Sequence, residues 1–245
     1  MKCLILAAGY ATRLYPLTEN FPKPLLKVGD KPILDWLIDD MSQTGLIDEY
    51  IVISNHKFAP IFKEWAEERN AQCKITVIDD GTSTNETRLG AVKDIQLAVD
   101  YLRLDTDLLV MAGDNLLDFS LEGFIRFAQE KQATCVMRYY EHDEKRLHKT
   151  GVAEIDAEGR ILSMEEKPAE PKSHWCIPAF YYYTREDASL IKKGIESGCG
   201  VDAPGSFIAW LSTQTNVYTY EMPGKRYDIG TLESYEAVKA IFDKK

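Results

Sequence analysis

The sequence predicts an α/β protein with a Rossmann-like three-layer α/β/α arrangement and a mainly parallel central sheet. Strand-length apolar runs alternate with helical apolar stripes through the first 140 residues. Alternating β and α units favour a parallel sheet that is covered on both faces. The chain of 245 residues is 45% hydrophobic and 28% charged, which is ordinary for one large globular domain or two small ones.

The expected strands of the first half are short buried runs. They are Cys3–Ala8, Tyr50–Ser54, Lys74–Asp79, Asp107–Ala112 and Thr134–Tyr139. The first expected helix carries an apolar stripe from Ile33 to Met41, with Gly45 where a C-terminal cap would lie. Further helices are expected at Phe58–Arg69, along the stripe from Leu89 to Leu102, and at Leu121–Lys131. In such sheets ligands bind at the carboxyl ends of the strands.

The second half has a different texture, with Gly, Pro and charged turns between its strands. The expected strands are Gly151–Ile155, Ile161–Met164, Phe180–Thr184 and Val217–Glu221. Helices are expected at Glu186–Glu196, Ser206–Leu211 and Leu232–Phe242. Alternation along a strand predicts that Tyr182 faces away from Tyr181 and Tyr183.

Bulk properties narrow the range of partners. A formal net charge of −10 makes nucleic acid a poor partner, because that affinity rests on Lys and Arg. No apolar run approaches the roughly 20 residues of a membrane helix, and the N-terminus does not resemble a signal peptide. Five dispersed cysteines without a CxxC motif argue against a disulfide framework or a zinc site. These observations predict a cytoplasmic protein, and the four histidines are expected at the surface.

Two segments near the N-terminus suit phosphate binding. The first strand leads into Gly9, where backbone N–H groups can face phosphate oxygens, and then into Arg13, whose guanidinium fits a polyphosphate. The alternative is an ordinary turn with a surface arginine. In the second segment two prolines flank Lys23 and hold the backbone extended.

Asp114 closes the strand Asp107–Ala112 in the segment Ala-Gly-Asp-Asn. A carboxylate at the carboxyl end of a parallel strand is well placed as a magnesium ligand. The alternative is a turn aspartate that caps the next element. Asp228 precedes the last expected helix, where it or Thr231 could cap the helix.

The run from Leu6 to Val28, with its AAGxxTRLxPLT and PKPLL segments, resembles the N-terminal signature of the sugar-phosphate nucleotidylyltransferases. Further matches follow in the family's order at Gly-Asp-Asn, Glu-Glu-Lys-Pro and Asp-Ile-Gly-Thr, so the resemblance covers nearly the whole chain. It is greatest to short glucose-1-phosphate thymidylyltransferase and uridylyltransferase types. The resemblance implies a GT-A-like nucleotidyltransferase fold and a Mg²⁺ cofactor.

The resemblance also implies roles for particular residues. Arg13, Lys23 and Lys167 would be catalytic, and Asp114 and Asp228 would bind the metal. Nucleotide binding is implied for Leu6, Ala7, Ala8, Gly9, Thr12, Arg13, Lys23, Asp80, Leu89 and Gly90. Sugar-phosphate binding is implied for Asn115, Gly151, Glu166, Lys167, Ile177 and Tyr181. We therefore expect one domain, with a nucleotide-binding half over residues 1–140 and a sugar-phosphate-binding half over residues 141–245.

The implied reaction moves a nucleoside monophosphate from a nucleoside triphosphate, dTTP or UTP being favoured, to a sugar 1-phosphate such as glucose 1-phosphate. Lys93 and Asp94 depart from the small residues or glutamine of many relatives, so the base stays open. Alternatives are a cytidylyltransferase that uses CTP with phosphocholine or a phosphonate, and a nucleotide-sensing module without turnover. A glycosyltransferase is a further alternative, but Asp105-Thr106-Asp107 lies before its strand rather than after it. The tetramer of longer thymidylyltransferases uses a C-terminal extension that has no counterpart in this sequence, so the resemblance does not imply a tetramer and leaves a monomer or a dimer open.

Overall fold

The structure is a computed structural model that describes residues 1–243, and its contacts group the chain into two compact units. Unit 1 comprises Met1–Arg88, Ala112–Glu122 and the described part of Pro223–Lys245. Unit 2 comprises Leu89–Met111 and Gly123–Met222. Both units are therefore assembled from segments that are distant in the sequence. No helix within residues 1–243 has the length and apolar character that a membrane span requires.

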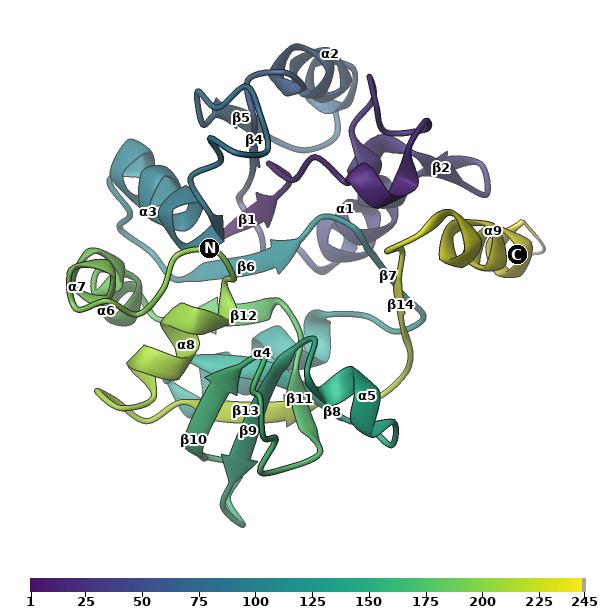
Figure 1. The fold of residues 1–245 in the computed structure, drawn as a ribbon. Coiled ribbons are helices and arrows are strands. Elements are labelled where there is room, and N and C mark those ends of the chain that lie inside the picture. The colour runs from purple at the N-terminus through teal and green to yellow at the C-terminus, as the bar shows by residue number, and fades with distance from the viewer. Residues whose placement is uncertain (244–245) are drawn as a thin grey trace. The chain divides into compact units, whose positions relative to one another are not determined.

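Three parallel strands form the sheet of unit 1. They are β1 (Lys2–Leu6), β4 (Glu49–Ser54) and β5 (Ile75–Asp79), with β4 between the other two (Figure 1). Every residue of β4 is buried, as expected for the middle strand of a covered parallel sheet. The connecting helices are α1 (Ile33–Thr44) and α2 (Ala59–Arg69). The predicted cap is present, because Gly45 ends α1 with a φ of +67°.

Short elements complete unit 1. They are η1 (Thr12–Leu14), η2 (Lys23–Leu25), β2 (Lys27–Val28), β3 (Lys31–Pro32), β7 (Asn115–Leu117), β14 (Arg226–Asp228) and α9 (Leu232–Phe242). Strands β7 and β14 pair antiparallel, although more than a hundred residues separate them. Helix α9 begins at a capping box in which Thr231 accepts from the backbone of Ser234.

One hydrophobic cluster, which we name the floor cluster, holds these short elements together. Its buried members are Leu14, Leu26, Val28, Ile33, Leu116, Ile229, Tyr235, Val238 and Phe242. The cluster takes residues from η1, β2, α1, β7 and α9, and Ile229 directly follows β14. It packs the short segments η1, β2 and β7 against the helices α1 and α9.

Unit 2 contains a mixed sheet. Its strands are β6 (Leu108–Ala112, the last residue counted in unit 1), β8 (Cys135–Tyr140), β9 (Gly151–Ile155), β10 (Ile161–Glu166), β11 (Trp175–Ile177), β12 (Phe180–Tyr183) and β13 (Tyr218–Glu221). The pairing is antiparallel throughout except between β13 and β8. The helices of this half of the chain are α3 (Ala91–Leu102), α4 (Glu122–Lys131), α5 (Glu144–Leu147), α6 (Arg185–Ala188), α7 (Ile191–Glu196) and α8 (Gly205–Leu211).

The predicted α/β class is confirmed, and the sheet is parallel only in part. The strand expected at Thr134–Tyr139 is β8, which runs antiparallel to its neighbours β11 and β12. Strand β12 also pairs antiparallel with β6, so it separates two strands that the alternation of β and α units suggested as parallel neighbours. Apolar content marks a strand as buried but does not give its direction. The expected helix Glu186–Glu196 is two short helices, α6 and α7.

Candidate functional site

A cavity of about 170 Å³ opens in unit 1 at the carboxyl end of β1. Its lining is Leu6, Ala7, Gly9, Ala11, Arg13, Leu14, Lys23, Pro24, Ala112, Asp114 and Gly230. Six of these residues were predicted from the sequence to bind nucleotide or metal. The cavity lies where ligands bind in open α/β sheets, outside the carboxyl ends of the strands.

The loop after β1 is held in an unusual conformation. Ala11 has a φ of +46°, in the left-handed region that favours glycine. Its carbonyl accepts from the buried hydroxyl of Thr18 at 2.8 Å and from the backbone N–H of Leu14 at 2.9 Å. A side chain in this region costs on the order of 1–2 kcal/mol, and such strain tends to persist at functional sites where the surroundings enforce it. The loop therefore presents Gly9 and Arg13 to the cavity in a fixed shape.

Lys23 reaches the same cavity from η2. It lies between Pro22 and Pro24, and only 7% of the residue is exposed. Its Nζ donates to Oδ2 of Asp114 at 2.7 Å, across 91 positions of sequence. Burial by itself would raise the pKa of the Asp114 carboxyl, but the Lys23 ammonium and the Arg226 guanidinium hold that pKa below its usual value. Asp114 is therefore an ionised carboxylate at neutral pH.

Asp228 lies beside this group because β7 and β14 pair. The register places Asp228 opposite Asn115, the residue that follows Asp114. A carboxylate oxygen of Asp228 also lies 4.0 Å from where a Cβ on the cavity residue Gly230 would be. The pairing thus places Asp228 across the ladder from the neighbour of Asp114 and next to Gly230, which lines the cavity.

This donor set fits a magnesium ion. Mg²⁺ in nucleotide sites takes one or two carboxylates and completes its shell with water and phosphate oxygens. Within residues 1–243 there is no cluster of three or more His, Cys, Asp or Glu side chains that could hold a metal by themselves. A pair of carboxylates at an open cavity suits an ion that arrives with a polyphosphate.

Among the other residues with a predicted nucleotide role, Ala8 follows β1 and Thr12 begins η1, whereas Asp80, Leu89 and Gly90 lie on two further segments. In unit 1, Asp80 accepts from the backbone and hydroxyl of Thr82, whose carbonyl accepts from the Tyr10 hydroxyl at 3.2 Å. Burial raises the pKa of Asp80 despite these bonds. In unit 2, Leu89 and Gly90 precede α3. Gly90 has a φ of +92°, and a Cβ there would lie 2.4 Å from the carbonyl oxygen of Val201, so glycine is required by packing alone.

In unit 2 the predicted sugar residues Gly151 and Glu166 face each other across the β9–β10 ladder. An oxygen of the Glu166 carboxylate lies 3.0 Å from where a Cβ on Gly151 would be and 2.2 Å from where one on Gly205 would be. The carboxylate therefore occupies a slot between two glycines. No donor within residues 1–243 hydrogen-bonds it, and burial raises its pKa. A half-buried carboxylate without a donor is suited to ligand hydroxyl groups.

Lys167 follows directly with a φ of +50°, in the same left-handed region as Ala11. Its backbone N–H donates to the carbonyl of Thr150 and its side chain is exposed. Tyr181 and Ile177 are each only 2% exposed. The rings of Tyr181 and Tyr183 lie 6.1 Å apart on one face of β12, whereas Tyr182 points away and donates to Asp107, as alternation predicted.

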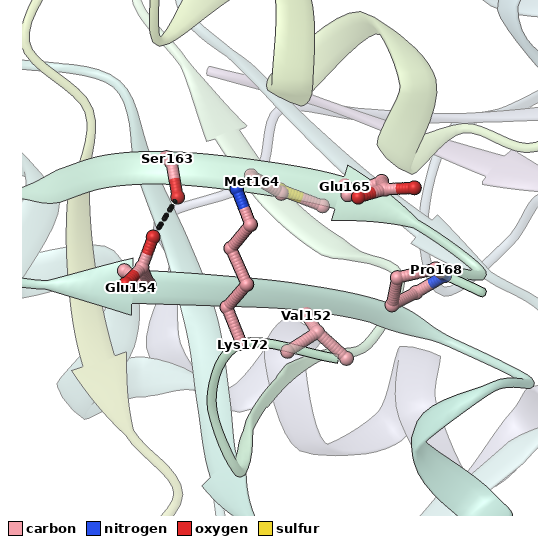
Figure 2. A pocket seen from close by; sticks show the side chains of 7 residues that line it. All are labelled: Val152, Glu154, Ser163, Met164, Glu165, Pro168 and Lys172. Carbon is pink, nitrogen blue, oxygen red and sulfur yellow. Dashed lines mark hydrogen bonds between the residues drawn. The ribbon is translucent and has the colours of Figure 1, made fainter. Parts of the chain in front are cut away.

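A second cavity, of about 90 Å³, lies in unit 2 and is lined by residues of β9 and β10 together with Pro168 and Lys172 (Figure 2). Glu154 and Glu165 line it, and Ser163 donates to Glu154 at 2.6 Å. Because successive side chains of a strand point to opposite faces of the sheet, Glu165 and Glu166 lie on opposite faces of β10. This hollow contains none of the predicted site residues, and it is too small for a nucleotide or a sugar phosphate.

Sequence reasoning missed Arg226 and Gly205. Arg226 donates from Nη1 to Oδ1 of Asn115 at 2.7 Å, and the amide of Asn115 donates to Oδ1 of Asp114 at 2.9 Å. A signal existed, because Arg226 lies only two residues before the Asp-Ile-Gly-Thr segment that carries the resemblance. Gly205 carried no local signal, because its importance depends on where Glu166 lies.

Comparisons with known proteins cover the whole chain. The sequence profile of the family described as "Nucleotidyl transferase" matches residues 2–245. A UTP–glucose-1-phosphate uridylyltransferase of Synechocystis is 26% identical over 100% of this chain and 64% of its own length. A glucose-1-phosphate thymidylyltransferase of Mycolicibacterium smegmatis is 31% identical over 75% of this chain and 61% of its own length. The chain thus spans less than two thirds of these two relatives.

The fold also matches solved structures. The crystal structure of a UDP-glucose pyrophosphorylase complexed with UDP-glucose superposes with a TM-score of 0.82, covering 100% of this chain and 99% of the other. Sequence identity over that match is 21%, so this likeness shows the fold alone.

Proposed function

Because the chain belongs to the nucleotidyl transferase family, we propose that it transfers a nucleoside monophosphate from a nucleoside triphosphate to a sugar 1-phosphate and releases pyrophosphate. The observation that carries the proposal is the grouping of Gly9, Arg13, Lys23 and Asp114 around one cavity. UTP or dTTP with glucose 1-phosphate is the favoured pair, since the two curated relatives described above are named for those substrates.

The chain's own residues have separable tasks in this reaction. The Gly9 loop and Arg13 hold the triphosphate, and Lys23 neutralises the leaving pyrophosphate. Lys167 binds the phosphate of the sugar, and Glu166 accepts from sugar hydroxyl groups. The attacking phosphate oxygen is already an anion, so no general base is needed. Catalysis consists of aligning two anions that repel each other and neutralising the charge that gathers at the α-phosphorus.

Asp114 and Asp228 are the residues proposed to hold Mg²⁺, which supplies a Lewis acid for the phosphate oxygens. The support is the lowered pKa of Asp114 and the pairing of β7 with β14, which sets Asp228 opposite Asn115, the residue after Asp114. The local cations and the metal explain how a chain with a net charge of −10 binds anionic substrates. The five dispersed cysteines without a CxxC motif support the proposed action in a reducing compartment.

The test is a matrix of nucleoside triphosphates against phosphorylated acceptors, read as pyrophosphate release. We expect release with UTP or dTTP and a hexose 1-phosphate, and only when Mg²⁺ is added. Pyrophosphate release with CTP and phosphocholine, but with no sugar phosphate, would indicate the cytidylyltransferase alternative instead. Nucleotide binding without release from any pair would indicate the sensing module instead.

Variants of the proposed site sharpen this test. Lys23→Ala and Asp228→Ala should each lower the rate by about a hundredfold or more, as the loss of a charge-stabilising group does elsewhere. The matched controls are Lys63→Ala and Asp105→Ala, each of which removes an exposed charge that is not part of the proposed site. Asp105 belongs to the D-x-D segment, so its loss would abolish activity only if the glycosyltransferase alternative were correct.

A further inference from the structure

A chain of hydrogen bonds links Arg226 to the carboxylate of Asp114. Nη1 of Arg226 donates to Oδ1 of Asn115 at 2.7 Å, and Nδ2 of Asn115 donates to Oδ1 of Asp114 at 2.9 Å. Lys23 donates to the other oxygen, Oδ2, at 2.7 Å. Both oxygens of Asp114 are therefore oriented by donors, and each oxygen retains a lone pair for a ligand.

The orientation of the Asn115 amide depends on Arg226. An asparagine amide can rotate by 180°, which would exchange its oxygen and its NH₂ group. With the oxygen toward Asp114, two acceptors would face each other in a buried environment, since Asn115 is only 3% exposed. The guanidinium of Arg226 has donors but no acceptor, so it can bind only the oxygen of the amide. Arg226 thus keeps the NH₂ group directed at Asp114.

The strand pairing makes this arrangement part of the fold. Arg226 begins β14 and pairs with Leu117 of β7, while Asp228 at the end of β14 pairs with Asn115. One three-residue strand therefore supplies Asp228 and, two positions earlier on the same face, the residue that orients Asp114. A change at Arg226 acts on Asp114 without altering either carboxylate.

We propose that Arg226 is a positioning residue that fixes the Asp114 carboxylate for a divalent metal through the amide of Asn115. This inference rests on the proposed function for the identity of the metal site, but it can be tested without turnover. Groups that orient metal ligands typically contribute 10–100-fold to metal affinity. Asp114 is one of two protein ligands, so we expect the lower end of that range.

The direction in which metal affinity changes on loss of Arg226 distinguishes a positioning role from a purely electrostatic one. Arg226 is a cation close to a cation site, so removing its charge should strengthen metal binding by electrostatics alone. Loss of positioning should weaken metal binding. Arg226→Gln removes the charge and is too short to reach Asn115, so the two explanations predict opposite changes in the same measurement.

The measurement is Mn²⁺ binding to the full chain, followed by electron paramagnetic resonance of free Mn²⁺ without nucleotide or sugar. We expect about tenfold weaker binding in Arg226→Gln and a smaller loss in Arg226→Lys, whose ammonium still donates and has no acceptor. Asn115→Ser breaks the chain of bonds in its middle while Arg226 keeps its charge, and it should also weaken binding about tenfold. Arg146→Gln, which removes an exposed arginine of α5, should bind Mn²⁺ like the wild type.

Unchanged or tighter Mn²⁺ binding in Arg226→Gln would overturn the proposal, as would a wild-type chain that does not bind Mn²⁺. If Arg226→Gln does not fold, judged by circular dichroism, Asn115→Ser decides by the same criterion. Failure of the proposed function gives a different result: Mn²⁺ binding weakens as expected, yet no pair in the substrate matrix releases pyrophosphate.

Discussion

The pair of Lys23 and Asp114 can be tested as a coupling energy. Nζ and Oδ2 are 2.7 Å apart, and the side chains are 9% and 36% exposed. At an effective dielectric constant of about 20, the attraction is about 6 kcal/mol. Most of it is offset by the desolvation of a buried ammonium, and solvent at the partly exposed carboxylate screens the rest. We expect a net coupling of about 1–2 kcal/mol.

The assay is a double-mutant cycle of Lys23→Met, Asp114→Asn and the double variant, measured by urea unfolding near neutral pH. Methionine keeps an apolar stem in the buried position and removes only the charge. Each single variant leaves its partner without an ion pair and should lose about 2 kcal/mol. The double variant should lose about 2–3 kcal/mol rather than the sum. Because the chain has two compact units, two spectroscopic probes should follow each transition.

The pH dependence of the coupling follows from the pKa of Asp114. That pKa is lowered in the folded state, so the ionised pair is fully present above the usual carboxyl pKa. The coupling is lost only as the pH falls through the lowered folded-state value. The coupling should therefore be equal at about pH 7.5 and about pH 5. A coupling below about 0.5 kcal/mol, or one that decays between those pH values, would refute the reasoning.

Three glycine-related changes test other parts of the structure. Ala11→Gly removes the cost of a side chain at a φ of +46°, but glycine also increases the conformational entropy of the unfolded chain. The free energy of unfolding in urea should therefore rise by about 0.5 kcal/mol. A lower free energy of unfolding would contradict the assigned strain. Gly90→Ala places a Cβ 2.4 Å from the backbone oxygen of Val201, and should cost about 3 kcal/mol or more in the same assay. Gly205→Ala places a Cβ 2.2 Å from the Glu166 carboxylate, and should raise the KM for sugar 1-phosphate about tenfold through lost hydrogen bonds, with the KM for nucleotide as the internal control. Equal changes in both KM values would argue against the slot.

The helices and strands were predictable where the local sequence alone, through its apolar period and its end residues, determines the element. The strand Gly151–Ile155 and the helix Leu232–Phe242 were predicted with the bounds that the structure shows. In both, an apolar pattern of the right period ends at a residue with a clear local role, such as Thr231 at the N-cap of α9. By contrast, β7 and β14 have three residues each and exist only because they pair with one another. No local pattern could have indicated them.

The candidate site was predictable as a set of segments but not as a network. Residue chemistry and family resemblance identified Lys23, Asp114 and Asp228 separately. The ion pair of Lys23 with Asp114 joins positions 91 apart, and the bond of Arg226 to Asn115 joins positions 111 apart. Such contacts depend on the packing of the whole unit. The sequence alone therefore gave no role to Arg226, which in the structure donates to the buried amide of Asn115.

The floor cluster explains how those distant charges meet. Leu14 directly follows Arg13, Leu116 lies two residues after Asp114, and Ile229 directly follows Asp228; all three apolar side chains are buried in that cluster. Burying a side chain of this size contributes roughly 1.5–3 kcal/mol, which exceeds what most partly exposed ion pairs contribute. The apolar residues therefore determine where the segments lie, and their charged neighbours are positioned with them. This division allows the strained Ala11 and the buried Lys23 to persist, because the stability that holds them comes from packing rather than from the site itself.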